Sequence, residues 1–197
     1  MELNKYNEIT GKLKTALKPA RYVHTLGVAF TAASLAMAYR LDVDRAMLAG
    51  LLHDCAKCFS DEEKLELCRE GNVELSKWEI ENPALIHAKL GVYIARRDYG
   101  VEDKEILDAI RTHTTGEPEM SMLQRIIFTA DLIEPNRDDI IPEMADFREL
   151  AFKNIDEAIY RITKNQLEFL SCQPGKVIDP TTVATHKYYK ALFEQEK

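Results

Sequence analysis

Four of the five histidines in this chain stand where they could bind a metal ion. They fall in four separate segments of the sequence: His24, His53, His87 and His113. His53 is followed directly by Asp54, and Asp131 stands among apolar residues, where an unpaired carboxylate would be costly to bury. Imidazole nitrogen with carboxylate oxygen suits iron, manganese, cobalt or zinc better than calcium or magnesium. These residue types therefore predict a metal site.

A single histidine on an apolar helix face is usually a hydrogen-bonded core residue, and this alternative applies to each histidine taken alone. It explains less well a set of four, together with a His-Asp dipeptide and an isolated aspartate. Helical bundles build metal sites by projecting such side chains inward from facing helices. We therefore favour the metal site over simple packing.

Three basic residues lie close to these groups in the sequence: Arg21, Lys57 and Arg137. Arg21 precedes His24 by one helical turn, and Lys57 can share the face of Asp54 if the helix continues. Taken alone, each would usually be a solvated surface residue. A polyphosphate, however, needs a metal to polarise one phosphoryl oxygen and cations to neutralise the others. The placement favours a phosphate-binding role.

The segments that must position these groups have helical periodicity, and we find no convincing alternating pattern of a strand. The sequence predicts an all-α fold and a single domain of 197 residues. Caps and breakers delimit the expected helices, with an irregular helical stretch after Pro142: 3–17, 19–40, 42–54, 60–71, 82–100, 103–116, 121–134, 154–170 and a terminal helix from 179. Trp78, in a polar stretch between these helices, is expected to anchor a loop to the core.

The composition limits the cellular location and the binding partners that we expect for this protein. The net charge of −7 argues against a general nucleic-acid or membrane binder, because both of those partners are polyanionic. The longest apolar-rich stretch, residues 23–39, is too interrupted to span a bilayer, and no targeting segment is visible. Four cysteines without a signal peptide fit reduced thiols in a cytoplasm. Redox or zinc chemistry at the Cys55–Cys58 pair is disfavoured, because no second such pair exists.

The sequence contains four distinctive motifs: GLLHDCAK at 50–57, AIRTHTTG at 109–116, ADLIEPNR at 130–137 and IDPTTVATHKYY at 178–189. In this order they resemble the HD superfamily of metal-dependent phosphohydrolases, in particular its branch of bacterial symmetrical diadenosine tetraphosphate hydrolases. The resemblance runs over residues 18–189. It implies a single HD-domain helical bundle over residues 1–197 with the metal site in its core. The core would span about 18–137, and a helical extension, about 142–197, would complete the nucleotide pocket.

The resemblance also implies site residues. The metal ligands would be His24, His53, Asp54 and Asp131, holding a divalent transition metal, with iron favoured and cobalt or manganese as alternatives. The catalytic residues would be Asp54, Lys57, His87 and His113. The nucleotide would contact Arg21, Tyr22, Val23, His24, Asp54, Cys55, Ala56, Lys57, His87, His113, Thr114, Arg137, Pro174, Gly175, Lys176, Val177, Ile178 and Asp179. The segment DDIIPEM after Arg137 departs from the Pro-Gly turn that the family pattern has there.

The implied activity is hydrolysis of diadenosine tetraphosphate and related dinucleoside polyphosphates to two nucleoside diphosphates, ADP or GDP. The main alternative is an HD-type nucleotidase or phosphodiesterase that acts on another nucleotide. A non-catalytic HD ligand-binding protein ranks last, because such proteins typically lack metal ligands that this chain retains. We expect one tightly bound metal with His87 and His113 on phosphate, although two metals bridged by Asp54 would also use these residues. A homodimer remains open.

Overall fold

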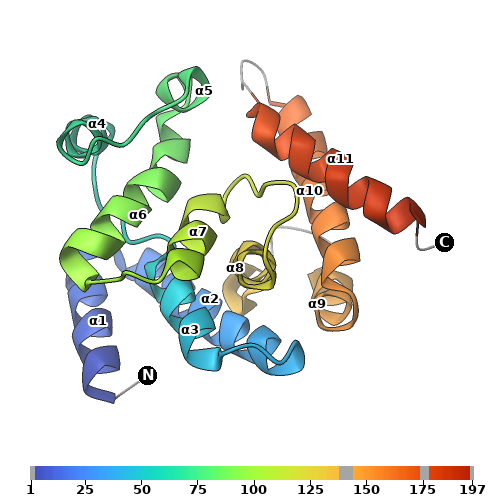
Figure 1. Cartoon of the computed structure of the whole chain (residues 1–197), viewed down its shortest axis with the longest axis horizontal. Helices are drawn as coiled ribbons and strands as arrows, with labels where there is room; N and C mark the ends of the chain where they lie inside the picture. Colours follow the sequence, from blue (N-terminus) through green and yellow to red (C-terminus); the bar gives the residue numbers. More distant parts are fainter. Residues whose placement is uncertain (1–2, 138–143, 174–177, 196–197) are drawn as a thin grey trace.

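The structure is a computed structural model that describes residues 3–137, 144–173 and 178–195. Within these ranges the regular elements are all helical, so the all-α prediction is confirmed, and a single helical domain fits the arrangement (Figure 1). The α-helices are α1 (Leu3–Ala16), α2 (Pro19–Ala38), α3 (Val43–Leu52), α4 (Asp61–Glu70), α5 (Lys77–Glu81), α6 (Ile86–Tyr99), α7 (Lys104–Thr112), α8 (Met122–Ile133), α9 (Met144–Lys153), α10 (Ile155–Ser171) and α11 (Pro180–Gln195). Two short 3-10 helices, η1 (Pro83–Leu85) and η2 (Pro135–Arg137), complete them.

The predicted starts of several helices are confirmed by their caps. Ser60 and Ser121 each form a capping box with the residue three positions later, at the starts of α4 and α8. The side chains of Asp42 and Asp103 accept hydrogen bonds from the first backbone N–H groups of α3 and α7. Gly100 ends α6 in the left-handed conformation, with φ of 64°, that glycine adopts without strain.

Two local predictions were wrong. The segment around Trp78 is the short helix α5 rather than a loop, because Ser76 and Glu79 form a capping box that the sequence reading overlooked. α7 ends at Thr112, earlier than expected, and His113 is its C-cap residue. The chain after His113 is therefore free to turn, and it does so up to Gly116, whose φ is 63°.

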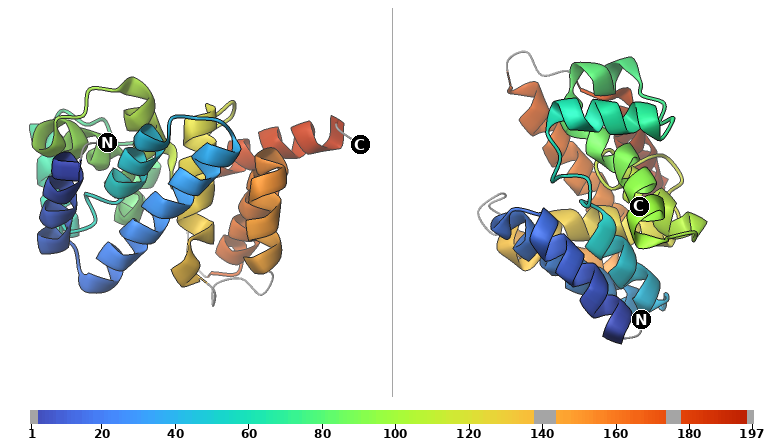
Figure 2. Two further views of the ribbon diagram at one scale, coloured as in Figure 1. Left: turned by 90° about the horizontal axis from the view of Figure 1, so that it is seen from below. Right: turned by 90° about the vertical axis from the view of Figure 1, so that its left-hand side faces the viewer.

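The core of the fold is built around α2. This helix packs along α3 and against α8, while α7 covers α3 and α8 from the other side (Figures 1 and 2). α10 packs on α8 and α9, and α11 lies beside α10. Gly50 allows α3 to approach α2, since a Cβ there would lie 2.7 Å from the Cα of Ala29. In the described ranges, no helix combines the length and apolar character needed to cross a membrane.

Candidate metal centre

The packing brings the predicted metal ligands and the two further histidines to one point inside the bundle. His24 projects from α2, His53 and Asp54 follow the end of α3, and Asp131 lies on α8. His87 is the second residue of α6, and His113 follows α7. All four histidine side chains are at least nine-tenths buried, as is that of Asp54. Segments far apart in the sequence thus share one buried cluster.

One half of the cluster lies between α2, α3 and α8. His24 Nε2 is 3.0 Å from Asp131 Oδ1 and 3.3 Å from His53 Nε2. His53 Nε2 is in turn 3.4 Å from Asp54 Oδ2. Nitrogen and oxygen atoms this close, on three helices, are placed to share one cation.

The other half of the cluster uses the second oxygen of the same aspartate. Asp54 Oδ1 is 3.3 Å from His87 Nε2 and 3.5 Å from His113 Nε2. The two imidazole nitrogens are 3.0 Å apart, and Thr114 Oγ1 is 3.1 Å from the first and 3.0 Å from the second. Asp54 therefore lies between two groups of histidines.

Local hydrogen bonds fix the tautomers of three of these rings. Nδ1 of His53, His87 and His113 lies 2.7, 2.5 and 2.7 Å from the carbonyl oxygen three residues earlier in the chain. A carbonyl can only accept, so Nδ1 carries the proton and Nε2 presents a bare lone pair. Bare nitrogens that face one another repel unless a proton or a cation lies between them.

The carboxylate of Asp54 also indicates that the cluster requires a cation. Its Oδ1 atom is buried and has no hydrogen-bond partner among the residues that the structure describes. A buried carboxylate oxygen without a partner is costly, and a cation would remove that cost. The donor set of imidazole nitrogens and carboxylate oxygens therefore fits a divalent transition metal.

Electrostatics keep the carboxylates of the cluster in the ionised state that a metal needs, whereas the pKa of His53 is raised, because the lowering effect of burial is outweighed by Asp54 and Asp131. Burial alone would raise the pKa of Asp54, but His53 and His113 outweigh it and hold that pKa well below its usual range. Asp131 behaves likewise, since His24 and His53 lower its pKa against the effect of burial. Burial, together with His113, holds the pKa of His87 well below the usual range. The carboxylates are therefore ionised and His87 is neutral at neutral pH.

The predicted cations flank the cluster. Arg21 Nη1 donates to Asp54 Oδ2 at 2.8 Å, and Arg137 Nη2 donates to Asp131 Oδ1 at 2.9 Å. Lys57 does not extend α3, which ends at Leu52; it lies beyond that end, where burial and the charge of Arg21 lower its pKa even though Asp54 opposes the shift. Two of the three cations thus directly contact proposed metal ligands.

Two hollows open from the cluster. One, of about 440 Å³, lies beside His24 between the start of α2 and η2, and it is lined by Arg21, Val23, Asn136 and Arg137. The other, of about 290 Å³, lies beside His87 between η1, α10 and α11, and its walls include Lys57, Thr114, Gln166, Phe169, Asp179 and Thr182. A ligand larger than one phosphate could extend from the cluster into either hollow.

The remaining residues expected at the nucleotide are placed unevenly. Val23 is half exposed and lines the first hollow, whereas Tyr22 packs against the core. Cys55 and Ala56 are 3% and 0% exposed, so their side chains pack in the core, and a contact of these two positions with the nucleotide stays a prediction. Ile178 is partly buried, and Asp179 lines the second hollow. Residues 174–177 and most of the segment after Arg137 lie outside the described residues.

Sequence reasoning missed several residues of this region. Glu134 is 1% exposed, and its Oε1 is 3.0 Å from His24 Nδ1. Its signal was a carboxylate that directly follows an apolar helix and precedes a proline. Gln166 and Phe169 lie on α10 and carry no sequence signal beyond helical periodicity.

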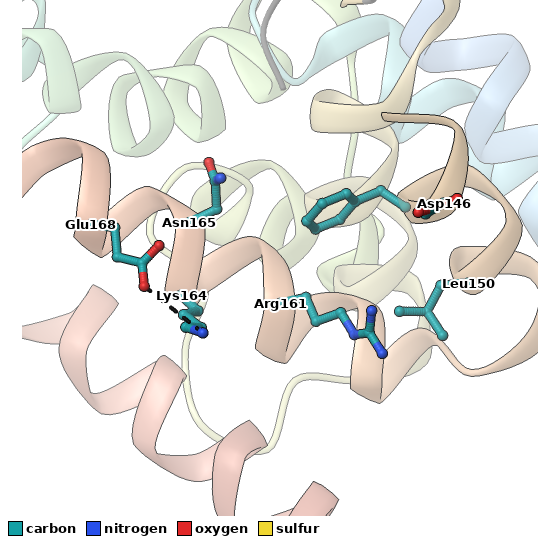
Figure 3. Close-up of a pocket in the computed structure, with 7 residues that line it drawn as sticks. Asp146, Leu150, Arg161, Lys164, Asn165 and Glu168 are labelled. Carbon is teal, nitrogen blue, oxygen red and sulfur yellow. Dashed lines mark ion pairs between the residues drawn. The ribbon is translucent and has the colours of Figure 1, made fainter. Parts of the chain in front are cut away.

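A separate hollow of about 330 Å³ lies between α9 and α10, away from the histidines (Figure 3). Both of its cations are already paired with carboxylates, Arg161 with Glu157 and Lys164 with Glu168. The described lining of this hollow includes no histidine and belongs to neither group of residues that could hold a metal ion, so we place the chemistry at the His/Asp cluster.

An all-helical core that presents a His-Asp pair, two further histidines and a distant aspartate at one point defines a class of metal-binding helical domains. The chain belongs to the HD domain family, whose model matches residues 21–136. HD domain hydrolases are metal-dependent, and the His/Asp cluster could bind a metal.

Curated relatives match nearly the whole chain. A protein of Halalkalibacterium halodurans named symmetrical bis(5'-nucleosyl)-tetraphosphatase is 41% identical over 93% of this chain and 95% of its own length. A Bacillus subtilis protein of the same name is 36% identical over 89% of this chain and 92% of its own length. A solved structure from Clostridium acetobutylicum, described as a predicted HD superfamily hydrolase involved in NAD metabolism, has a TM-score of 0.90 at 35% identity and covers 95% of this chain and 97% of that chain.

Proposed function

We propose that this protein hydrolyses diadenosine tetraphosphate and related dinucleoside polyphosphates symmetrically, releasing two nucleoside diphosphates, ADP or GDP. The observation that carries the proposal is the convergence of bare imidazole nitrogens on both oxygens of the buried Asp54, with arginines beside them. The names of the curated relatives, which match nearly the full length, support the same substrate class.

The metal would be held by His24, His53, Asp54 and Asp131. Two imidazoles and two carboxylates favour iron, with cobalt or manganese as alternatives, over magnesium. When bound, such an ion would polarise a phosphoryl oxygen and make a water molecule nucleophilic at neutral pH.

A second ion would fit beside the first. From the sequence we favoured one metal, with His87 and His113 on phosphate. The geometry supports a different proposal, in which these two histidines and Asp54 Oδ1 would hold a second ion. Two nitrogens that are 3.0 Å apart, each with its proton on the far side of the ring, favour an ion over two neutral contacts to an anion.

The substrate phosphates would lie across the cluster. Arg21 and Arg137 would neutralise them on the side of the first hollow. On the side of the second, Lys57 would neutralise them and the hydroxyl of Thr114 would donate a hydrogen bond. Because guanidinium groups bind phosphate oxygens in a fixed plane, the arginines would also orient the chain of phosphates.

One nucleoside would occupy the second hollow. The exposed ring of Phe169 offers a stacking surface for a base, and Gln166 and Asp179 offer polar partners. These residues come from the C-terminal helices, so we propose that the segment 142–197 belongs to the same single domain and completes the pocket of the core at 18–137. The second nucleoside would leave through the first hollow, beside Val23.

Symmetrical cleavage requires attack at the phosphorus second from one adenosine, so that the leaving group is itself ADP. A diphosphate is stabilised as it leaves by Arg21 and Arg137, which reduces the need for an acid. Asp54 can accept a hydrogen bond from the attacking water. The distance from the nucleoside pocket to the cluster would set the bond that breaks.

An HD-type nucleotidase or phosphodiesterase is the alternative, because it would use the same cluster with a different pocket. The name of the Clostridium structure, which refers to NAD metabolism, keeps this class open. A non-catalytic binding protein is disfavoured, since His24, His53, Asp54 and Asp131 all reach the cluster. A cytoplasmic location and a homodimer stay predictions.

Product chromatography tests the proposal. The metal-loaded protein is incubated with diadenosine tetraphosphate, and the products are separated by ion exchange, with the Asp54→Asn variant as a control. ADP as the sole product supports the proposal. ATP plus AMP would show asymmetric cleavage, and turnover of mononucleotides without dinucleotides would move the protein to the nucleotidase class.

A further inference from the structure

Glu134 is a buried carboxylate that acts on no substrate in the proposed mechanism. It follows the last turn of α8, it is 1% exposed, and its Oε1 lies 3.0 Å from Nδ1 of His24. Its other oxygen, Oε2, accepts hydrogen bonds of 2.8 Å from both the backbone N–H and the side-chain amide of Asn136. Both oxygens therefore have partners, and the side chain is fixed.

This partner distinguishes His24 from the other histidines of the cluster. Nδ1 of His53, His87 and His113 faces a backbone carbonyl three residues earlier in the chain. Nδ1 of His24 instead faces a carboxylate 110 residues away. A carboxylate on the far nitrogen fixes the tautomer of a histidine and increases the basicity of its other nitrogen. That other nitrogen, Nε2, is the one that lies 3.0 Å from Asp131.

The backbone is shaped to admit this carboxylate. Gly27 lies on α2 one turn after His24, and a Cβ at this position would stand 2.2 Å from Glu134 Oε2. No side chain could occupy that space while Glu134 keeps its place. Gly27 and Glu134 thus depend on each other, because the missing side chain at position 27 leaves the space that the carboxylate of Glu134 occupies.

We propose that Glu134 is a positioning residue that orients His24 and strengthens its Nε2 as a metal ligand. This inference rests on the proposed metal centre. It assigns to Glu134 a role in metal affinity rather than contact with the substrate.

Cobalt titration tests the role. Glu134→Gln keeps the shape, but one amide cannot accept from His24 and also accept two hydrogen bonds from Asn136, because one of its ends is a donor. The dissociation constant for Co²⁺, followed by visible absorption, is expected to rise about 10- to 100-fold, and the absorption bands should change. The matched control is Glu79→Gln, which alters another buried carboxylate, paired with Lys89, outside the cluster.

Gly27→Ala provides a second variant, which removes no polar group from the protein. It should displace Glu134 and weaken cobalt binding in the same direction, while circular dichroism verifies the fold. If both variants bind cobalt as the unaltered protein does, with the same spectrum, the positioning role is wrong. Failure of the unaltered protein to bind cobalt would instead overturn the metal centre itself, so the two failures are distinguishable.

Discussion

Nε2 of His87 lies 3.3 Å from Oδ1 of Asp54, whereas the other oxygen of that aspartate is the one within 3.4 Å of His53. A single carboxylate thus faces a different histidine with each of its oxygens. The two halves of the cluster cannot be altered independently at this residue, and that coupling can be tested.

Asp54→Ala is expected to remove all bound metal and all activity, because it deletes a ligand from both halves. His87→Ala should lower the metal content of the purified protein by about half and abolish turnover, since it alters only one half. His186→Ala is the control, as this histidine hydrogen-bonds Thr163 away from the cluster. Elemental analysis by mass spectrometry gives the metal content. Full metal content in the His87 variant would show that His87 is not a metal ligand and would favour a contact with the substrate phosphates.

Arg21→Ala and Arg137→Ala should each lower kcat/KM for a dinucleoside polyphosphate by about 100- to 1,000-fold, the range found when a donor to developing charge is removed. The control is Arg161→Ala, which removes an arginine from the hollow between α9 and α10 (Figure 3). Steady-state kinetics with the metal-saturated proteins measure the effect. Equal losses in all three variants would show that the arginines act through general charge rather than position.

Gly50→Ala should destabilise the fold by about 1–3 kcal/mol, because a Cβ would press on the backbone of α2 at Ala29. The carbonyl of Gly50 also accepts from His53, so metal affinity should fall with stability. Gly11→Ala is the matched control: none of the described residues lies within 4 Å of its Cβ, and a helix gains about 0.5–1 kcal/mol from that change. Urea unfolding reports both values. A neutral result at position 50 would mean that the helices can separate without cost.

Alkaline unfolding should depend on Tyr189. Burial raises the pKa of Tyr189 from 10.0 to about 12, although Arg125 opposes the shift. Below pH 10 both the folded and the unfolded state keep the phenol proton, so the stability is fully present. Between pH 10 and about 12 only the unfolded state loses that proton, and the free energy of unfolding falls.

Tyr189→Phe should flatten this fall. Its hydroxyl has no hydrogen-bond partner among the described residues, so stability at neutral pH should change by less than about 1 kcal/mol. Urea unfolding at several alkaline pH values compares the two proteins. Parallel curves above pH 10 would contradict the assignment.

Helix starts could be predicted because their signals are local. Ser60 with Glu63 and Ser121 with Gln124 satisfy the first backbone donors within four residues, whatever the rest of the chain does. The end of α7 could not be predicted from local signals in this way. His113 is the C-cap residue of that helix and its Nδ1 donates to the carbonyl of Ile110, and periodicity carries no sign of either.

The site residues also divide into those with a local sequence signal and those without one. Asp131 was predictable because a carboxylate among apolar residues requires a partner, and Asp54 because it directly follows His53. The roles of Glu134 and Gly27 depend on α8 lying against α2, and no local pattern states which helices meet. The burial of Cys55 and Ala56 was unpredictable for a related reason: adjacency to Asp54 in the chain says nothing of which way their side chains face.

The contact between His24 and Glu134 joins residues 110 positions apart. A metal held by His24 and Asp131 would likewise link distant residues and close the chain between them, most of the HD core, into one ring. Closing a long ring removes much conformational freedom from the unfolded state. On a ribosome, where the N-terminal part emerges first, this ring cannot close until α8 has been made. Metal uptake would then be among the last events in the maturation of the chain, and a chelator would loosen the whole bundle rather than one corner of it.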